Sequence, residues 1–267
     1  MLGRLLGTGR TAEVYEWTPD RVIKLFYRNT TLADVNREFS KHQLIEKAIA
    51  YCVKAYTIET INQRHGIVYD RVKGMSMMEK LMAEPTCIEQ LARRLGRTHA
   101  DLHKTNLSEL TSMKTAFEIQ LKNSPHFCSH EKTQLIELLD GLPGGEVLCH
   151  MDFHPDNLFV DGETVTVLDW SNALKGDPMA DVARTIMILQ FAEIPNVSAE
   201  ERENIDNMRH DLIKAYINGY GEDRINDPER LKDWTTVLLA LRLSENNSEA
   251  EKNLVSNELI GRLKERP

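Results

Sequence analysis

The stretch from Leu148 to Trp170 holds residues whose types and spacing suit one kind of chemistry. His150, Asp152 and Asn157 form the pattern H-x-D-x-x-x-x-N, and a second acid, Asp169, follows twelve residues after the asparagine. A carboxylate can receive or orient a hydroxyl proton, and a carboxylate with an amide oxygen can hold Mg²⁺ against phosphates. The pattern therefore indicates phosphoryl transfer. It is short enough to occur by chance, so the rest of the chain must support it.

The residues between these groups predict the element that brings the two acids together. Two short apolar runs, at 157–160 and 164–168, flank the turn signal Asp161-Gly162. This arrangement is typical of a β-hairpin, whose two ends lie side by side. We therefore expect the second acid, Asp169, to return beside the loop that carries the first.

Upstream, the segment LGTGRTAEVY begins a glycine pattern with Gly7 and Gly9, although Ala12 stands where a third glycine would complete it. Two glycines alone fit a dinucleotide-binding turn as well as a flap over phosphates. A dinucleotide fold needs a helix at this point, whereas the next six residues alternate as in a strand. A turn and a second strand, at 21–26, follow. This order favours the flap.

Lys24 lies within the apolar run of that second strand, RVIKLF. A buried charge is costly unless it is paired, and an isolated lysine here would be assigned to the solvent face. After a glycine-rich hairpin, a fixed ammonium is well placed to neutralise the α- and β-phosphates of a nucleotide. Glu38, in the helical pattern at 32–50, is the expected partner, with Glu46 and Glu13 as alternatives.

Two further strand-like runs end at Lys73-Gly74, where a helical pattern begins. We expect the lobes of a two-lobed enzyme to join here, with a nucleotide-binding lobe at 1–72 and a catalytic, acceptor-binding lobe at 73–267. Extended backbone offers a carbonyl and an N–H at alternate residues. The carbonyl of Asp70 and the N–H of Val72 are predicted to contact the adenine edge.

In the order of these parts the chain resembles the kinases, and more narrowly the aminoglycoside phosphotransferase and choline kinase-like family. The segment HMDFHPDN resembles the H-x-D-x-H-x-x-N of that family, with His154 inside the loop. Trp170 follows the second acid where a protein kinase has Phe-Gly, and a D-x-A-R segment begins at Asp181. The resemblance covers residues 3–190, and the C-terminal third carries no motif that we can assign.

This resemblance implies an α+β, two-lobed protein-kinase-like fold. Its N-lobe is a small antiparallel β-sheet with one helix, and its C-lobe is mostly helical and carries the catalytic-loop hairpin. The resemblance also implies ATP and Mg²⁺ as cofactors, with Asp152 as the catalytic base and Asn157 and Asp169 as the metal ligands.

The same resemblance assigns roles to residues around these groups. Lys24 with Glu38 would clamp the nucleotide phosphates. His150 would brace the catalytic loop, and Asp181 would accept hydrogen bonds from its backbone. Ala12 departs from the fuller glycine pattern, which leaves the contacts of the glycine turn open.

The composition limits the classes of partner. The net charge of −8 and the pI near 5.6 oppose nucleic acid as a partner, because binding to its backbone needs a basic surface. No apolar run approaches the length of a membrane span, and the start of the chain lacks a signal-peptide core. The four cysteines lack zinc-site spacing, so we expect free thiols and a cytoplasmic location.

Acidic residues are concentrated between Glu193 and Asp233, a segment that contains eleven acidic and six basic residues. This segment permits a cationic acceptor such as an amino-sugar or an amino-alcohol, and the alternative is a solvated helical surface. The aromatic residues Tyr216, Tyr220 and Trp234 could bind a quaternary amine through cation–π attraction. Packing in the core is the favoured interpretation for all three.

His99 and His103 lie four residues apart on a predicted helix, a spacing that metal-binding pairs share. Because no third ligand accompanies them in the sequence, we expect packing or surface roles.

The sequence therefore predicts an ATP- and Mg²⁺-dependent phosphotransferase acting on a hydroxyl of a small molecule. The alternative from another class is a nucleotide-binding regulator that keeps the kinase fold without useful catalysis. Such a protein typically lacks one ionic group of the site, whereas here Lys24, Asp152, Asn157 and Asp169 are all present. A protein kinase is disfavoured because the chain has no activation segment.

Overall fold

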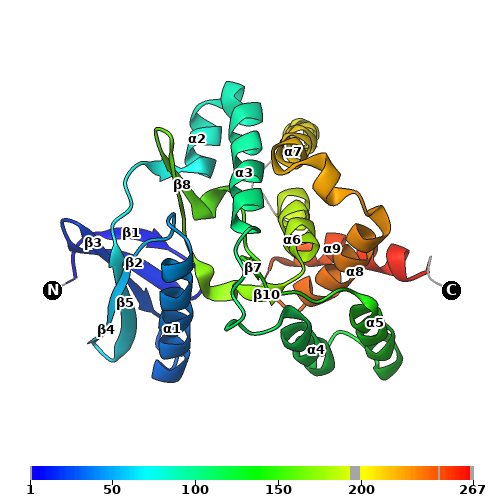
Figure 1. Ribbon diagram of the computed structural model, residues 1–267, viewed down its shortest axis with the longest axis horizontal. Helices are drawn as coiled ribbons and strands as arrows, with labels where there is room; N and C mark the ends of the chain where they lie inside the picture. The colour runs from blue at the N-terminus through cyan, green and yellow to red at the C-terminus, as the bar shows by residue number, and fades with distance from the viewer. Residues whose placement is uncertain (1, 193–198, 246, 265–267) are drawn as a thin grey trace. The chain divides into compact units, whose positions relative to one another are not determined.

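The computed structural model describes residues 2–192, 199–245 and 247–264, which belong to two compact units. Met1–Lys80 and Pro155–Asn172 form the first unit, and Leu81–His154 and Ala173–Pro267 form the second. The first contains an antiparallel sheet with one long helix, and the second is mainly helical (Figure 1). The expected α+β, protein-kinase-like class is confirmed.

The sheet of the first unit has five antiparallel strands in the order β1-β2-β3-β5-β4. Their bounds are Leu5–Thr8, Ala12–Thr18, Arg21–Phe26, Ala55–Ile61 and Arg64–Asp70 for β1 to β5. In β3 the apolar residues alternate between the two faces, so that Phe26 joins one core cluster while Ile23 and Leu25 join the other. The sheet therefore separates two cores, as period-two patterning requires.

Helix α1 (Leu32–Ala48) begins with a capping box, in which Thr31 and Asp34 bond reciprocally to each other's backbone N–H groups. Val35 and Phe39 of the helix pack on the sheet face that carries Phe26 and Ile67. Figure 1 shows α1 lying along this face of the sheet. This packing brings Glu38 of the helix beside Lys24 of β3.

The predicted hairpin is present as β8 (Leu158–Asp161) and β9 (Thr164–Val167). Its turn contains Gly162 at a φ of 56°, a conformation that glycine adopts without a steric penalty. A short strand, β6 (Met75–Ser76), pairs with β8 and completes a three-stranded sheet.

The helices of the second unit follow one another along the chain. They are α3 (Ile88–Leu102), α4 (Met113–Asn123), α5 (Ser129–Gly141), α6 (Pro178–Phe191), α7 (Ala199–Tyr220), α8 (Pro228–Arg242) and α9 (Glu249–Lys264). A shorter helix, α2 (Met77–Ala83), precedes them, and single 3-10 turns lie at Pro85–Cys87, Pro155–Asn157, Trp170–Asn172 and Glu222–Ile225. One core cluster of this unit runs from α4 and α5 through α6 and α8 to α9.

The segment after residue 72 contains more strand than the sequence indicated. Besides the hairpin and β6, a two-stranded sheet pairs β7 (Val147–Cys149) with β10 (Leu174–Gly176). β10 has only three residues, too few for a readable period. β7 leads directly into the loop that carries His150 and Asp152.

The two compact units do not divide the chain at residue 72. Residues 73–80 and the hairpin segment 155–172 group with the sheet of the first unit, because β6 pairs with β8 and Cys52 bridges to Val167. The functional lobe boundary after residue 72 stays a prediction.

Among residues 2–192, 199–245 and 247–264, none of the helices combines the length and the apolar character that crossing a bilayer requires.

Candidate active site

Asn157 and Asp169 lie at the open end of the β8–β9 hairpin. Leu158 pairs with Val167, and the Leu168 N–H donates to the Asn157 carbonyl oxygen at 2.8 Å. The two side chains therefore leave adjacent backbone positions. Asp169 has a φ of 56°, an unusual conformation for a non-glycine residue that often marks a functional site. These are the two residues predicted to hold Mg²⁺.

The Asp169 carboxylate contacts the predicted phosphate clamp. Lys24 Nζ lies 2.9 Å from Glu38 Oε1 and 3.0 Å from Asp169 Oδ1. The expected pairing of Lys24 with Glu38 is confirmed, whereas the alternative Glu46 bonds the Ala55 N–H and Glu13 pairs with Arg64. One ammonium from β3 is thus held between a helix carboxylate and the hairpin carboxylate.

The electrostatic environment keeps Lys24 charged. Burial by itself would lower the pKa of its ammonium, but the carboxylates of Asp169 and Glu38 outweigh burial and raise the pKa to about 12. Charge-assisted hydrogen bonds to both acids fix the direction of the side chain. A permanent positive charge at a fixed point is what binding of an anionic phosphate chain requires.

The glycine turn lies between β1 and β2. The N–H of Gly9 donates to the Ala12 carbonyl oxygen at 2.8 Å, and the Tyr27 hydroxyl donates to the Gly9 carbonyl oxygen. Neither Gly7 nor Gly9 has a positive φ, and no atom lies within 4 Å of a Cβ placed on Gly7. Gly7 therefore leaves open space at the turn, whereas a Cβ on Gly9 would lie 3.5 Å from the Ala12 carbonyl oxygen. Ala12 is buried in the sheet core, where a methyl group is accommodated.

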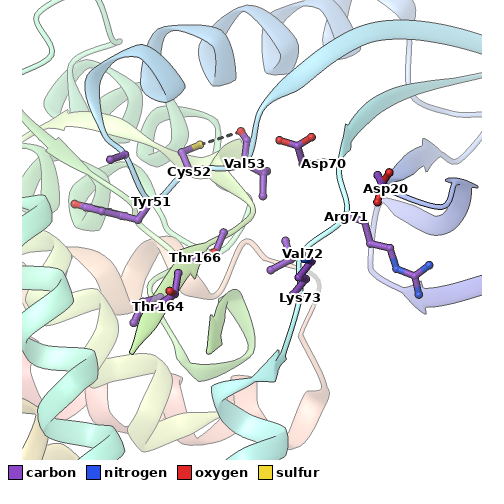
Figure 2. A pocket seen from close by; sticks show the side chains of 12 residues that line it. Asp20, Tyr51, Cys52, Val53, Asp70, Arg71, Val72, Lys73, Thr164 and Thr166 are labelled. Carbon is purple, nitrogen blue, oxygen red and sulfur yellow. Dashed lines mark hydrogen bonds between the residues drawn. The ribbon is translucent and has the colours of Figure 1, made fainter. Parts of the chain in front are cut away.

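Asp70 and Val72, predicted to contact adenine, line a cavity of about 550 Å³ in the first unit. Figure 2 shows its wall, formed by Asp20, by the loop that precedes β4, by the segment after β5 and by threonines of β9. The carboxylate of Asp70 accepts from the Tyr56 hydroxyl at 2.7 Å. Because Lys24 and Gly7 are not among the lining residues, the adenine contacts stay a prediction.

In the second unit, Asp152 lies in the loop after β7, directly after two residues whose backbone is held by Asp181. Met151 has a φ of 63°, and the N–H groups of His150 and Met151 both donate to the Asp181 carboxylate, at 2.5 and 2.8 Å. Consecutive N–H groups that converge on one anion form a nest. The Asp152 N–H donates to His150 Nδ1 at 3.2 Å. His150 and Asp181 therefore brace the loop, as the resemblance implied.

The Asp152 carboxyl group is ionised. Burial by itself would raise its pKa, but the hydrogen bond and charge of His154, followed by the charges of Arg184 and His150, hold the pKa far below its usual range. His154 Nε2 lies 3.7 Å from Asp152 Oδ2. Such a weak base can orient a hydroxyl group and accept its proton late in the reaction, but it cannot remove the proton beforehand.

Two residues that the sequence did not single out for this role hold the segment after Asp169. Lys41 of α1 donates to the Ser171 carbonyl oxygen at 2.6 Å, and the buried Trp170 indole donates to the Val167 carbonyl oxygen at 3.2 Å. The sequence signal for Lys41 was its position three residues after Glu38, because residues at this spacing lie on the same face of a helix.

His99 is fully buried, in agreement with the expected packing role, but its surroundings include a partner that the sequence did not indicate. A third side chain does accompany His99 and His103, because Asp181 lies 3.0 Å from His99 Nε2 and 3.2 Å from His103 Nε2. The sequence could not indicate it, since 78 residues separate Asp181 from His103.

Other residues behave as the sequence suggested. Tyr216, Tyr220 and Trp234 are buried, as expected of core aromatics. Cys149 is fully buried, and burial raises the pKa of its thiol well above the usual value. All four cysteines are free.

Of the acidic segment, Glu193 lies outside the described residues, and Asp227 serves as the N-cap of α8.

The sequence matches the model of one protein family. Residues 3–234 match the model described as the phosphotransferase enzyme family, which spans both compact units. No curated protein matches the chain in a sequence search.

Solved structures with the same fold cover nearly the whole chain. The amicoumacin kinase hAmiN in complex with AMP-PNP, Ca²⁺ and Ami is similar at a TM-score of 0.63 and 15% identity, over 99% of this chain and 88% of that one. A choline/ethanolamine kinase family protein from Mesorhizobium loti has a TM-score of 0.58 and 16% identity, over 100% and 89%.

A third similar structure is the gentamicin–APH(2″)-IIa complex, at a TM-score of 0.59 and 14% identity, over 99% of this chain and 91% of that chain. At 14–16% sequence identity, the similarity to these three structures shows that the chain has the same fold.

Proposed function

The chain belongs to the phosphotransferase enzyme family and is a small-molecule kinase, and on this premise we propose that it moves the γ-phosphate of ATP to an acceptor hydroxyl in a Mg²⁺-dependent reaction. The observation that carries the proposal is the position of Lys24, 2.9 Å from Glu38 and 3.0 Å from Asp169. A purely structural lysine needs one carboxylate partner. A second one, on a residue with positive φ, supports a site built for a charged ligand.

Each residue of the candidate site has a distinct task in the proposed reaction. Lys24 neutralises charge on the nucleotide phosphates, and Glu38 fixes the position of its ammonium. The glycine turn at Gly7 and Gly9 leaves room for the phosphates to approach its backbone. Asp152 orients the acceptor hydroxyl and accepts its proton as the phosphoryl group arrives. Positioning and charge neutralisation, more than strong base chemistry, supply the acceleration.

Asn157 and Asp169 fit the ligand preference of Mg²⁺, which binds hard oxygen donors such as amide and carboxylate oxygens. When bound there, Mg²⁺ would neutralise charge on the phosphates. The hydrogen bond between Lys24 and Asp169 supports a role for this carboxylate beside the proposed phosphate clamp.

The charge of the chain and the solved structures with the same fold support one class of acceptor. The net charge of −8 favours a cationic small molecule, and the solved structures with this fold include a gentamicin complex and a choline/ethanolamine kinase family protein. We propose an amino-sugar or an amino-alcohol as the acceptor.

The experiment is nucleotide turnover by the purified protein with Mg²⁺, measured across aminoglycosides, amino-alcohols, sugars and hydroxy-amino acids. Asp152→Asn and Asp169→Ala are assayed in parallel, with nucleotide binding followed by calorimetry. We expect Asp152→Asn to lose about 10²- to 10⁴-fold in turnover while it still binds nucleotide. Asp169→Ala should lose Mg²⁺-dependent binding and essentially all turnover.

Two outcomes would contradict the proposal. Near wild-type turnover of Asp152→Asn on the true acceptor would remove Asp152 from its role. Absence of turnover with the whole panel, while nucleotide still binds tightly in the presence of Mg²⁺, would favour the nucleotide-binding regulator.

A further inference from the structure

Asp181 is the centre of a buried polar cluster in the second unit. Its Oδ1 accepts from the Met151 N–H, and its Oδ2 accepts from the His150 N–H. The same Oδ2 lies 3.2 Å from His103 Nε2 and 3.0 Å from His99 Nε2. The catalytic loop is therefore attached to α3 through one carboxylate, which is fully buried.

Each histidine has a second partner on α7. His99 Nδ1 lies 2.8 Å from the Tyr216 hydroxyl, and His103 Nδ1 lies 2.8 Å from the Tyr220 hydroxyl. Two tyrosines, two histidines and one aspartate therefore form two parallel chains of polar contacts. Both chains end on the N–H groups that precede Asp152.

The close approach of α3 and α7 makes these contacts possible (Figure 1). The histidines are four residues apart on one helix, and the tyrosines are four residues apart on the other, so that both pairs are in register. A Cβ added at Gly96 would overlap the Tyr216 carbonyl oxygen, and one added at Gly219 would overlap the Arg93 backbone. Glycines thus let the two helices lie in backbone contact.

The direction of the hydrogen bonds follows from the charges. An ionised carboxylate only accepts hydrogen bonds, so His103 must present an Nε2–H to Asp181. A neutral imidazole that carries its proton on Nε2 accepts at Nδ1, the atom that lies 2.8 Å from the Tyr220 hydroxyl in His103. The tyrosine hydroxyl must then donate to Nδ1. Tyrosine thereby selects the histidine tautomer that bonds to Asp181.

The two chains differ in their contact with Asp181. Oδ2 forms a hydrogen bond with His103 Nε2 at 3.2 Å, whereas His99 Nε2, although 3.0 Å away, has no hydrogen-bond partner among the described residues. One carboxylate oxygen has two lone pairs, and the His150 N–H and His103 occupy them. The chain through Tyr220 and His103 is therefore the connected one.

We propose that Tyr220 and His103 are positioning residues, whose hydrogen-bond relay to Asp181 fixes the backbone of the catalytic loop and hence the place of Asp152. This inference rests on the proposed function for its kinetic consequence only. Helix α7 contributes to the reaction through this relay without touching the reacting atoms.

A bound cation is the competing interpretation, because the ligand atoms of His99, His103 and Asp181 all lie within 4.8 Å of one another. The relay is favoured because it satisfies the Asp181 carboxylate without a cation: the carboxylate already accepts the N–H groups of His150 and Met151 and a contact from His103 Nε2. Metal analysis of the protein, purified without chelator, separates the two interpretations.

The test compares Tyr220→Phe, His103→Ala and His103→Gln in the full-length protein. Hydrogen exchange at the amides of His150 and Met151 reports the anchoring of the loop, and ¹⁵N spectra of the imidazole rings report the tautomer of His103. We expect Tyr220→Phe to speed exchange of these amides at least about tenfold. It should lower kcat by about 10- to 100-fold and leave the KM for nucleotide unchanged.

Two further variants calibrate these effects. His103→Gln keeps an N–H donor at the Nε2 position and should recover much of what His103→Ala loses. Thr236→Val removes a buried hydroxyl that donates to the Lys232 carbonyl oxygen at 2.9 Å in α8, far from Asp181 in sequence. It should leave amide exchange and kcat at wild-type values.

The outcomes decide between distinct conclusions. Exchange and kcat in Tyr220→Phe equal to those in Thr236→Val would overturn the relay, as would one equivalent of tightly bound metal. If the wild type transfers no phosphate but Tyr220→Phe still speeds exchange at His150 and Met151, the proposed function fails while the relay stands.

Discussion

Lys24 shows how one residue type takes its meaning from its neighbours. In an apolar strand an ammonium is unfavourable, and only the carboxylates of Glu38 and Asp169 make its burial tolerable. The side chain is 15% exposed, so its charge is only partly screened by solvent. A group held charged at this cost in desolvation is typical of a ligand site.

Replacing Lys24 with methionine should raise the KM for nucleotide and lower kcat by about 10²- to 10³-fold, because one stabilising charge on the phosphates is lost. Steady-state kinetics with varied nucleotide measure both effects. Lys122→Met is the matched control, since Lys122 is exposed on α4 and pairs only with Glu118 among the contacts described. Equal kinetics for the two variants would contradict the role of Lys24.

His99 predicts how stability depends on pH. Its pKa is about 4 in the folded protein, lowered by burial, against 6.5 for the free side chain. Between these values the unfolded chain binds more protons than the folded one, so the free energy of unfolding should fall as the pH is lowered from 6.5 to 4. Denaturant unfolding at several pH values measures this slope.

In His99→Gln the free energy of unfolding should fall less steeply between pH 6.5 and 4, because the titrating group is absent. The difference in slope should be up to about 1.4 kcal/mol per pH unit. Comparing slopes removes any constant cost of the substitution. Parallel profiles for the two proteins would mean that His99 titrates normally in the folded state.

At the scale of elements, the α3–α7 pair depends on two glycines as much as on its apolar residues. Gly96 and Gly219 each face the backbone of the other helix at a distance that excludes a methyl group. This close packing explains why histidines of α3 reach tyrosines of α7. The histidines in turn lie beside Asp181, which binds the backbone of the loop that carries Asp152.

Gly96→Ala should therefore destabilise the protein by about 1–3 kcal/mol or more, because the new Cβ forces the helices apart. The matched control is Gly261→Ala in α9, where nothing lies within 4 Å of the added Cβ. That substitution should stabilise by about 0.5–1 kcal/mol through helix propensity alone. Urea unfolding of both variants tests the contrast, and a neutral Gly96→Ala would contradict the packing argument.

At the scale of the whole molecule, the balance of charge bears on the acceptor. The chain has 41 acidic and 33 basic residues, and its net charge of −8 produces a negative potential around the protein. Such a potential attracts cations and repels nucleic acid. It leaves the nucleotide to be bound by local positive groups such as Lys24.

We therefore expect the KM of a cationic acceptor to rise as NaCl is increased from 10 to about 300 mM, since salt screens the long-range attraction. A neutral hydroxyl acceptor turned over by the same protein should show no such rise. If the two acceptors respond alike, the net charge does not contribute to acceptor binding.

The local parts of this protein were readable from its sequence. The strand at 21–26, the helix from Leu32, the hairpin turn and the Lys24–Glu38 pair all follow from short periods and adjacent elements. Local hydrogen bonding and side-chain periodicity determine such features, because the residues involved are close in sequence or in successive elements. The order of charged groups was sufficient to indicate the family.

Only the tertiary structure decided which distant residues meet. The grouping of 155–172 with the first unit, the contact of Lys41 with Ser171 and the assembly of His99, His103 and Asp181 join positions that many residues separate. No sequence period relates such positions, since helix packing and the glycines that permit it bring them together. The sequence by itself therefore determined the chemical groups and their elements, and packing decided how those groups are held.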